Sequence, residues 1–206
     1  LAVGPGLGTE STSASLLAAA LERNVPLLLD ADALNLSGAD PTLKRALAAR
    51  TAPTVLTPHP AEAARMLGTD TASVQADRLH AALEIAAQYR ALVVLKGCGS
   101  IVASPDGRWF INGTGHPGMA SAGMGDVLTG LIVGLLAQGW PAESALIAGV
   151  HLHGAAADRL AREGIGPIGL TASETIDAAR GVFNGWLIEA QRDPRLAGAA
   201  PLRGGR

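Results

Sequence analysis

Short apolar runs alternate with helical stripes along this chain. Residues 26–32, 54–60 and 91–97 each contain a short apolar run that ends in acids, in prolines or in Lys-Gly, a pattern typical of buried strands. Between the last two runs, apolar residues recur at helical spacing, as Leu79, Ala82, Leu83 and Ala86. The alternation predicts an α/β fold in which a mainly parallel central sheet is covered by helices on both faces.

Local signals mark further elements and their ends. Residues 13–23 are rich in Ala and Leu and predict a helix, and residues 100–112 predict a hairpin around Pro-Asp-Gly. Asp40-Pro41 opens a helix to about Ala49, and Pro60 begins a short helix that ends at Gly68. The remaining helices are expected at 126–138, at about 142–163 and after the capping-box pattern of residues 171–174.

Composition narrows the classes of protein that fit. The chain has 206 residues, is 48% hydrophobic and 3% aromatic, and carries a formal net charge of -2. It contains no dense basic run, which argues against nucleic acid as a partner. The longest apolar stretch, residues 127–140, is shorter than the ~20 residues of a membrane span. The single cysteine and the lack of a visible signal peptide predict a cytoplasmic protein.

The two ends of the chain indicate how far the folded domain extends. The opening residues, LAVGPGLG, have the pattern of a buried strand that is ending, so we expect the chain to begin inside its fold, with an N-terminal part missing. The stretch from Asp193 is rich in Gly, Pro and Arg. We therefore expect one domain over 1–192 and a disordered tail over 193–206.

Unusual polar and glycine residues follow the predicted strands. They are Gly4 to Gly8, Asp30, Asp32, His59 and Lys96. Ligands of open parallel sheets bind beyond the carboxyl ends of the strands. For Asp30 and Asp32, hydrogen bonding within their own turn is favoured over a contact with substrate or with metal-bound water.

The segment GMASAGMGDVLTG, residues 118–130, places Asp126 between spaced glycines and a strongly apolar helix. The first N–H groups of a helix lack acceptors and carry positive partial charge. Gly123 and Gly125 would let an anion approach them closely. An acid at this position is favoured in its ionised form and could accept a proton; the alternative is that Asp126 only caps the helix.

Residues 112–130, NGTGHPGMASAGMGDVLTG, resemble the signature of the ribokinase-like superfamily, and within it most closely the ADP/ATP-dependent NAD(P)H-hydrate dehydratases. Further stretches match that family in order: VGPGLGTE, LLLDADALN, TPHPAEAARMLG and VVLKGCGS. The resemblance implies a ribokinase-like fold. It also implies that Asp126 is the catalytic base and that the amides of Gly123, Met124 and Gly125 form an anion hole.

The same resemblance implies roles at the other strand ends. It assigns the nucleotide, through its AMP moiety, to Lys96, Gly97, Cys98, Gly99, Ser100 and Gly125. It assigns the hydrated nicotinamide substrate to Gly6, Gly8, His59 and Asp126. Glu62 takes the place of the acid in the superfamily's Asn-x-x-Glu element, which helps to organise Mg²⁺, but His59 stands where the Asn is expected. An exposed first-turn glutamate is the alternative for Glu62.

Several residues depart from the family pattern or have a structural rather than a functional interpretation. His116 stands where Asn commonly precedes Pro-Gly-Met, and Ser100 replaces a usual Thr. The Met124 side chain has no role if only backbone amides are used. His151 and His153, two residues apart, do not share a helix face, so we expect His153 to be a core residue rather than a metal ligand.

The resemblance implies a lyase that returns hydrated NADH or NADPH to NAD(P)H. ADP or ATP would be the phosphoryl donor and Mg²⁺ the cofactor. The family also implies a homo-oligomer, a homotetramer by resemblance, and an NAD(P)H-hydrate epimerase domain as a fused or separate companion. Two alternatives stay open: a ribokinase-like kinase of a thiazole or hydroxymethylpyrimidine alcohol, and a non-catalytic nucleotide-binding fragment.

Overall fold

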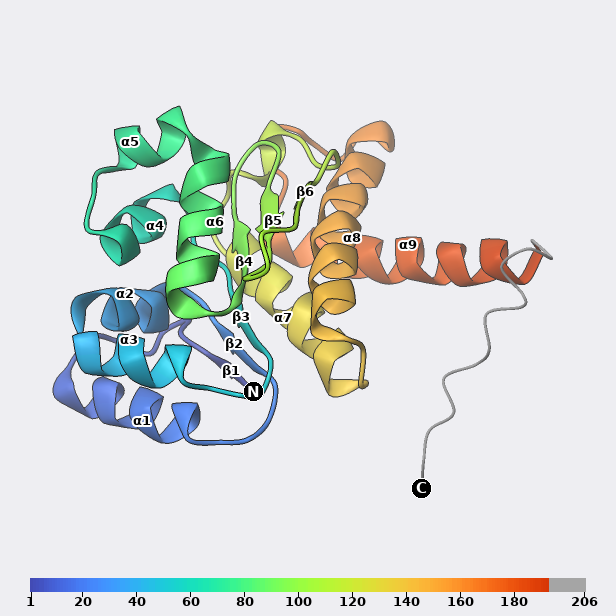
Figure 1. Cartoon of the computed structure of the whole chain (residues 1–206). Helices are drawn as coiled ribbons and strands as arrows, with labels where there is room; N and C mark the ends of the chain where they lie inside the picture. The colour runs from blue at the N-terminus through green and yellow to red at the C-terminus, as the bar shows by residue number, and fades with distance from the viewer. Residues whose placement is uncertain (193–206) are drawn as a thin grey trace, which may run out of the picture.

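The computed structural model describes residues 1–192, and their strands form one six-stranded sheet in the order of the chain (Figure 1). The first four strands are parallel, and the last two pair antiparallel as the predicted hairpin. This arrangement confirms the predicted α/β class with a mainly parallel sheet. The strands are β1 (Ala2–Val3), β2 (Leu27–Leu29), β3 (Thr54–Leu56), β4 (Leu92–Leu95), β5 (Ile101–Ala103) and β6 (Trp109–Ile111).

Helices cover both faces of the sheet, as the sequence predicts. One face is covered by α1 (Ser11–Leu21), α2 (Ala31–Ala39), α3 (Pro41–Ala48), α4 (Pro60–Leu67), α5 (Thr71–Ala76) and α6 (Arg78–Tyr89). The other is covered by α7 (Met124–Ala137) and α8 (Ala142–Arg162), on which α9 (Ala172–Arg192) packs. A short 3₁₀ turn, Pro117–Met119, precedes α7.

Successive residues of one strand serve two different cores. In β2, Leu27 and Leu29 pack with the helices of the first face, whereas Leu28 packs with α7 and α8. Side chains alternate across a strand, so a strand buried on both faces can be apolar throughout. The position of the sheet between two helical layers therefore follows from the continuous apolar runs.

Most predicted helix ends are confirmed by their capping contacts. The Asp40 carboxylate accepts the Thr42 N–H at 2.7 Å, with Pro41 as the first helical residue. Gly68 ends α4 in the left-handed conformation. Thr171 and Glu174 form the expected capping box, in which each backbone N–H donates to the other's side chain.

Helix α2 is not expected from the sequence, because residues 30–35, DADALN, are typical of a turn. Asp, Asn, Ser and Gly are weak helix formers. Burial of Ala33, Leu34 and Leu36 in the core stabilises this helix instead, an effect of tertiary packing that local propensity does not contain.

Within residues 1–192, no helix combines the length and the apolar character needed to cross a bilayer. The expectation of a disordered tail from Asp193 falls outside the described residues.

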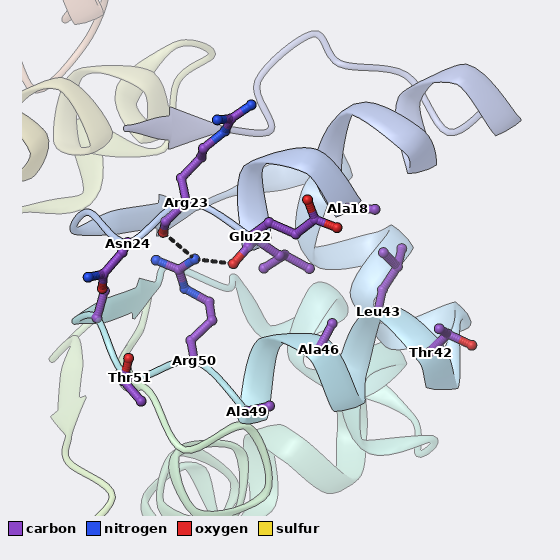
Figure 2. A pocket seen from close by; sticks show the side chains of 12 residues that line it. Ala18, Glu22, Arg23, Asn24, Thr42, Leu43, Ala46, Ala49, Arg50 and Thr51 are labelled. Atoms are coloured by element: carbon purple, nitrogen blue, oxygen red, sulfur yellow. Dashed lines mark hydrogen bonds between the residues drawn. The ribbon is translucent and has the colours of Figure 1, made fainter.

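A cavity of about 490 Å³ lies between α1 and α3, and Arg50 stands at its edge (Figure 2). The Arg50 guanidinium donates to the carbonyl oxygens of Leu21, Arg23 and Val25. The lining residues 21–24 precede β2 and residues 49–52 precede β3, which places the cavity at the amino ends of the strands. It therefore lies away from the edge at which ligands of such sheets bind.

Candidate active site

A buried ion pair joins the carboxyl ends of β2 and β4. Asp30, only 2% exposed, accepts a hydrogen bond from Lys96 Nζ at 2.8 Å through Oδ1. Its other oxygen, Oδ2, accepts from the Thr129 hydroxyl of α7 at 3.0 Å. The expectation that Asp30 satisfies its own turn is therefore wrong, because both oxygens bind side chains distant in sequence. The contact fixes α7 against the strand ends.

The first turn of α7 presents unpaired backbone donors. Gly123, at φ 85°, is the N-cap, and the first helical bond runs from the Val127 N–H to its carbonyl oxygen. Within residues 1–192, the N–H groups of Met124, Gly125 and Asp126 donate to no acceptor. Orphan amides at a helix start form an anion-binding site. The amides predicted to form an anion hole are therefore free donors, while their binding of an anion stays a prediction.

The Asp126 carboxylate is exposed in this first turn. It forms no side-chain capping bond, and Gly123 occupies the cap position. Within the described residues, Asp126 makes no ion pair. The alternative that Asp126 only caps the helix is therefore wrong. Its oxygens are free to accept a proton from a ligand.

Gly125 brings the anion hole and Lys96 together. A Cβ at Gly125 would lie 3.5 Å from Lys96 Nζ and 3.7 Å from Asp30 Oδ2. The bare backbone of α7 thus lies directly over the ion pair. One ammonium group and three amide donors consequently share a small region.

The Met124 side chain anchors the start of α7. It is buried among residues of α8 and α9, and its sulfur lies 3.9 Å from the Thr175 hydroxyl oxygen. The expectation that this side chain has no role is corrected in one respect, since it holds the amides in place.

His59 and Glu62 cap α4 together. His59 Nδ1 accepts the Ala61 N–H at 3.1 Å, so the ring proton is on Nε2, which lies 3.2 Å from Glu62 Oε1. Glu62 Oε2 accepts the His59 N–H at 2.7 Å and lies 3.8 Å from Lys96 Nζ. Glu62 is buried, so the alternative of an exposed first-turn glutamate is wrong. Its carboxylate forms a second ion-pair contact with Lys96, beside that of Asp30.

The glycine turn after β1 is packed against the same strand end. A Cβ at Gly4 would stand 1.7 Å from the Asp30 carbonyl oxygen. The Gly8 N–H donates to Asp32 Oδ2 at 2.9 Å, so Asp32 holds this turn rather than its own. Gly6, at φ 68°, faces open space. The turn carrying Gly6 and Gly8 therefore lies beside Asp30, while the substrate contacts assigned to both residues stay predictions.

The 96–100 loop follows β4 and is closed by its own contacts. Gly97 and Gly99 have φ values of 144° and 63°, and the Ser100 hydroxyl donates to the Gly97 carbonyl oxygen at 3.0 Å. Serine thus keeps a hydroxyl contact at the position where the family has threonine. Cys98 is exposed, and its thiol is free.

Arg78 also touches this loop, and sequence analysis missed it. Its guanidinium, from the first turn of α6, donates to the carbonyl oxygens of Leu95, Lys96 and Cys98. A cation is disfavoured in the first turn of a helix by the helix dipole. That mismatch is the one sequence signal that could have drawn attention to Arg78.

The histidines of the second half have structural contacts. His116 Nδ1 accepts the Gly118 N–H at 2.9 Å, while Nε2 lies 3.1 Å from the Ala157 carbonyl oxygen, so histidine caps this turn. His153 is buried, as predicted. Desolvation first, and the Lys96 charge second, lower the pKa of His153 to about 4. His151 packs on the Trp186 ring instead, with ring centroids 5.5 Å apart.

Metal ligands are sparse around this edge of the sheet. Over the described chain, no group of three His, Cys, Asp or Glu side chains is placed to hold a metal ion. The site therefore has no cage for a resident metal. Its orphan amides and Lys96 suit a ligand anion, and Asp126 suits a proton transfer beside it.

Comparisons with known proteins identify the family of this chain. The model of the family described as NAD(P)H-hydrate dehydratase matches residues 1–178. The chain is 49% identical over 184 residues to an ADP-dependent (S)-NAD(P)H-hydrate dehydratase from Neisseria meningitidis, covering 88% of this chain and 62% of that protein. It is 48% identical over 164 residues to a bifunctional NAD(P)H-hydrate repair enzyme from Moorella thermoacetica, covering 79% and 30%. The chain thus spans less than two thirds of either relative.

Solved structures match as well. The ADP/ATP-dependent NAD(P)H-hydrate dehydratase from Bacillus subtilis, co-crystallized with ATP/Mg²⁺, superposes with a TM-score of 0.81 at 36% identity, covering 90% of this chain and 64% of that one. A ribokinase-like superfamily protein from Enterococcus faecalis gives 0.70 at 28% identity, covering 89% and 62%. These matches confirm the ribokinase-like fold. With the family model matched over residues 1–178 and a relative 49% identical over 184 residues, the chain belongs to the NAD(P)H-hydrate dehydratase family.

Proposed function

We propose that this chain catalyses the nucleotide-dependent dehydration of hydrated NADH or NADPH to NAD(P)H. The observation that carries the proposal is the first turn of α7. Gly125 of this turn lies directly over the Lys96–Asp30 pair, and the same turn carries the unpaired amides and the exposed Asp126 carboxylate. Membership in the dehydratase family supports the choice of substrate.

The amides of Met124, Gly125 and Asp126 would hold the terminal phosphoryl group of ADP or ATP. In phosphoryl transfer, negative charge is spread over the equatorial oxygens, so catalysis rests on positioned donors. The amides are fixed before a ligand arrives, because Met124 and Thr129 anchor α7 on two sides. Lys96 adds a positive charge next to them.

Asp126 would accept the proton of the hydroxyl group on the hydrated nicotinamide ring. The hydroxyl oxygen then bonds to the phosphorus as the bond from phosphorus to the nucleotide breaks. Phosphate departs with the C–O bonding electrons, and the adjacent ring carbon gives a proton to solvent water as its C–H electrons form the double bond. The net change is the loss of water from the ring, coupled to hydrolysis of the nucleotide.

Mg²⁺ fits this site as an ion carried by phosphates. The ion usually keeps several waters and takes one or two carboxylates beside the substrate phosphates. Glu62 would be its protein ligand, because its carboxylate accepts the His59 N–H and lies 3.8 Å from Lys96 Nζ without filling all its lone pairs. When bound, Mg²⁺ supplies neutralisation of phosphate charge.

The remaining site residues would orient the two ligands. The 96–100 loop would take the AMP moiety, and Gly6, Gly8 and the exposed part of His59 would line the nicotinamide. Both ring nitrogens of His59 are engaged in the α4 cap, so its ring offers the substrate a fixed face.

A coupled assay tests the proposal. The chain is incubated with hydrated NADH, ADP and Mg²⁺, and the absorbance of regenerated NADH is followed. We expect NADH and inorganic phosphate to appear in equal amounts. Accumulation of a phosphorylated thiazole or pyrimidine alcohol from the corresponding alcohol, without NADH formation, would favour a kinase instead.

We make three further proposals, on a companion activity, on assembly and on the compartment. The bifunctional name of the Moorella relative supports a companion repair activity, which we propose to be an NAD(P)H-hydrate epimerase. From the family resemblance alone, we propose assembly into a homotetramer. The chain has a single cysteine, which supports a location in the reducing cytoplasm. Light scattering of the purified chain tests the assembly state.

A further inference from the structure

The carbonyl oxygens of the loop after β4 converge on one side chain. Arg78 Nη2 lies 3.3 Å from the Leu95 oxygen and 3.4 Å from the Lys96 oxygen, and Nη1 donates to the Cys98 oxygen. A Cβ at Gly97 would stand 2.8 Å from Nη2. The loop therefore wraps closely around the guanidinium, and a glycine at position 97 makes that approach available.

Peptide geometry fixes what the loop presents on its other side. In a trans peptide, the C=O and N–H groups point in opposite directions. The Lys96 carbonyl shares its peptide with the Gly97 N–H, and the Cys98 carbonyl shares its peptide with the Gly99 N–H. Since both carbonyls turn toward Arg78, both N–H groups turn away from it. Within residues 1–192, neither of them donates to an acceptor.

We propose that Arg78 is a positioning residue that gives the 96–100 loop its affinity for a nucleotide phosphate. It gathers the carbonyl oxygens on one side, so that a phosphate approaching from the other side meets N–H donors. The inference rests on the proposed function for the identity of the ligand as a nucleotide. Arg78 itself acts through the loop.

The shape of the guanidinium matters as much as its charge. A guanidinium carries five donors in a planar fork and can bind carbonyls of several residues at once. A lysine ammonium keeps the charge but does not reproduce that fork. An Arg78→Lys variant should therefore hold the loop less well than Arg78 and better than the neutral Arg78→Gln.

Arg50 offers a matched control in the same chain. It also donates to three backbone carbonyl oxygens, those of Leu21, Arg23 and Val25, but at the amino ends of the strands (Figure 2). Arg50→Gln removes the same type of contact far from the candidate site. It reports what the loss of a carbonyl-binding guanidinium does to stability alone.

The test measures ADP affinity by calorimetry and backbone hydrogen exchange over residues 95–102 in the 206-residue chain without ligand. We expect Arg78→Gln to bind ADP about tenfold more weakly, with faster exchange in the loop and a KM for ADP that rises more than kcat falls. Arg78→Lys should lie between Arg78→Gln and the unmodified chain. Arg50→Gln should lower the melting temperature while keeping ADP affinity within about twofold.

Two results would overturn the inference. One is unchanged exchange in the loop of Arg78→Gln, and the other is an equal loss of ADP affinity in Arg50→Gln. If Arg78→Gln does not fold, Arg78→Lys supplies the same comparison. An unmodified chain that binds no ADP would contradict the proposed function. The exchange measurement would still test whether the Arg78 side chain holds the loop in place.

Discussion

Lys96 Nζ lies 2.8 Å from Asp30 Oδ1, although the two residues follow strands that are separated by β3. The Asp30 side chain is 3% exposed and that of Lys96 is 19% exposed. The pair spans the carboxyl edge of the sheet beneath the first turn of α7. The ion pair therefore supports the helix turn that carries Asp126, the proposed base.

Removing the ammonium should destabilise the fold. Lys96→Met leaves the Asp30 carboxylate buried with only the Thr129 hydroxyl as a side-chain donor, and breaking one half of a buried pair costs about 3–5 kcal/mol. Adding Asp30→Asn in the same chain removes the uncompensated charge and should recover part of that loss. Urea unfolding of the two single variants and the double variant measures the coupling. Strictly additive losses would contradict it.

Asp126→Asn should abolish NADH formation while leaving ADP affinity within a few-fold of the unmodified chain. The amide cannot accept the proton, whereas the backbone donors of α7 are unchanged. Turnover assays and calorimetry check the two halves of the prediction. Asp106→Asn, in the exposed hairpin turn, is the control for loss of one carboxylate. Near-normal turnover in Asp126→Asn would remove Asp126 from the mechanism.

Two glycines of one turn should respond differently to alanine. Gly4→Ala would force a Cβ to within 1.7 Å of the Asp30 carbonyl oxygen, so we expect it not to accumulate as folded protein. Gly6→Ala meets open space and strains only the backbone at φ 68°, which costs about 1–2 kcal/mol. It should fold and raise the KM for hydrated NADH. Expression yield, circular dichroism and kinetics check both.

Stability should fall as pH falls from about 6.5 to about 4, in part through His153. Burial lowers the pKa of His153 to about 4, so below its ordinary value the unfolded chain binds a proton that the folded chain does not. The contribution is present above pH 6.5 and is lost toward pH 4, in total about 3 kcal/mol.

His153→Leu should flatten that part of the profile. Unfolding free energies measured between pH 4 and pH 7 test this expectation. His80→Gln, at a side chain that is 73% exposed, should leave the profile unchanged. An identical slope in His153→Leu and the unmodified chain would show that other groups produce it.

Arg90→Gly should stabilise the chain by about 1 kcal/mol. Arg90 ends α6 in the left-handed conformation, at φ 50°, which glycine adopts without steric cost. The melting temperature should rise by about 2–4 °C, with NADH formation unchanged. A lower melting temperature would mean that the Arg90 side chain stabilises this corner through contacts that outweigh the strain.

Local pattern was sufficient to predict most of this fold. The apolar runs at β2, β3 and β4 are continuous because each strand is buried on both faces, and capping residues such as Asp40 mark helix starts through contacts one turn long. Helix α2 shows where such reasoning ends, because it is stabilised by burial against distant helices.

The candidate site was predictable where one short segment contains both the geometry and the chemistry. Asp126 and its glycines lie within four residues, so the motif describes the first turn of α7 directly. Contacts between residues that are distant in sequence could not be predicted in this way. Asp30 meets Lys96 and Thr129 at separations of 66 and 99 residues, and Arg78 meets loop carbonyls that no side-chain pattern reveals.

The three leucines of β2 are interchangeable by chemistry but divided between two cores. A slide of this strand by one residue would keep leucine at two of its three positions, so the apolar contacts alone oppose it weakly. The same slide would carry Asp30 away from Lys96 and Thr129 and bury an ammonium without its partner. The carboxylate that supports the site thus also distinguishes the native alignment of β2 from its nearest misalignment.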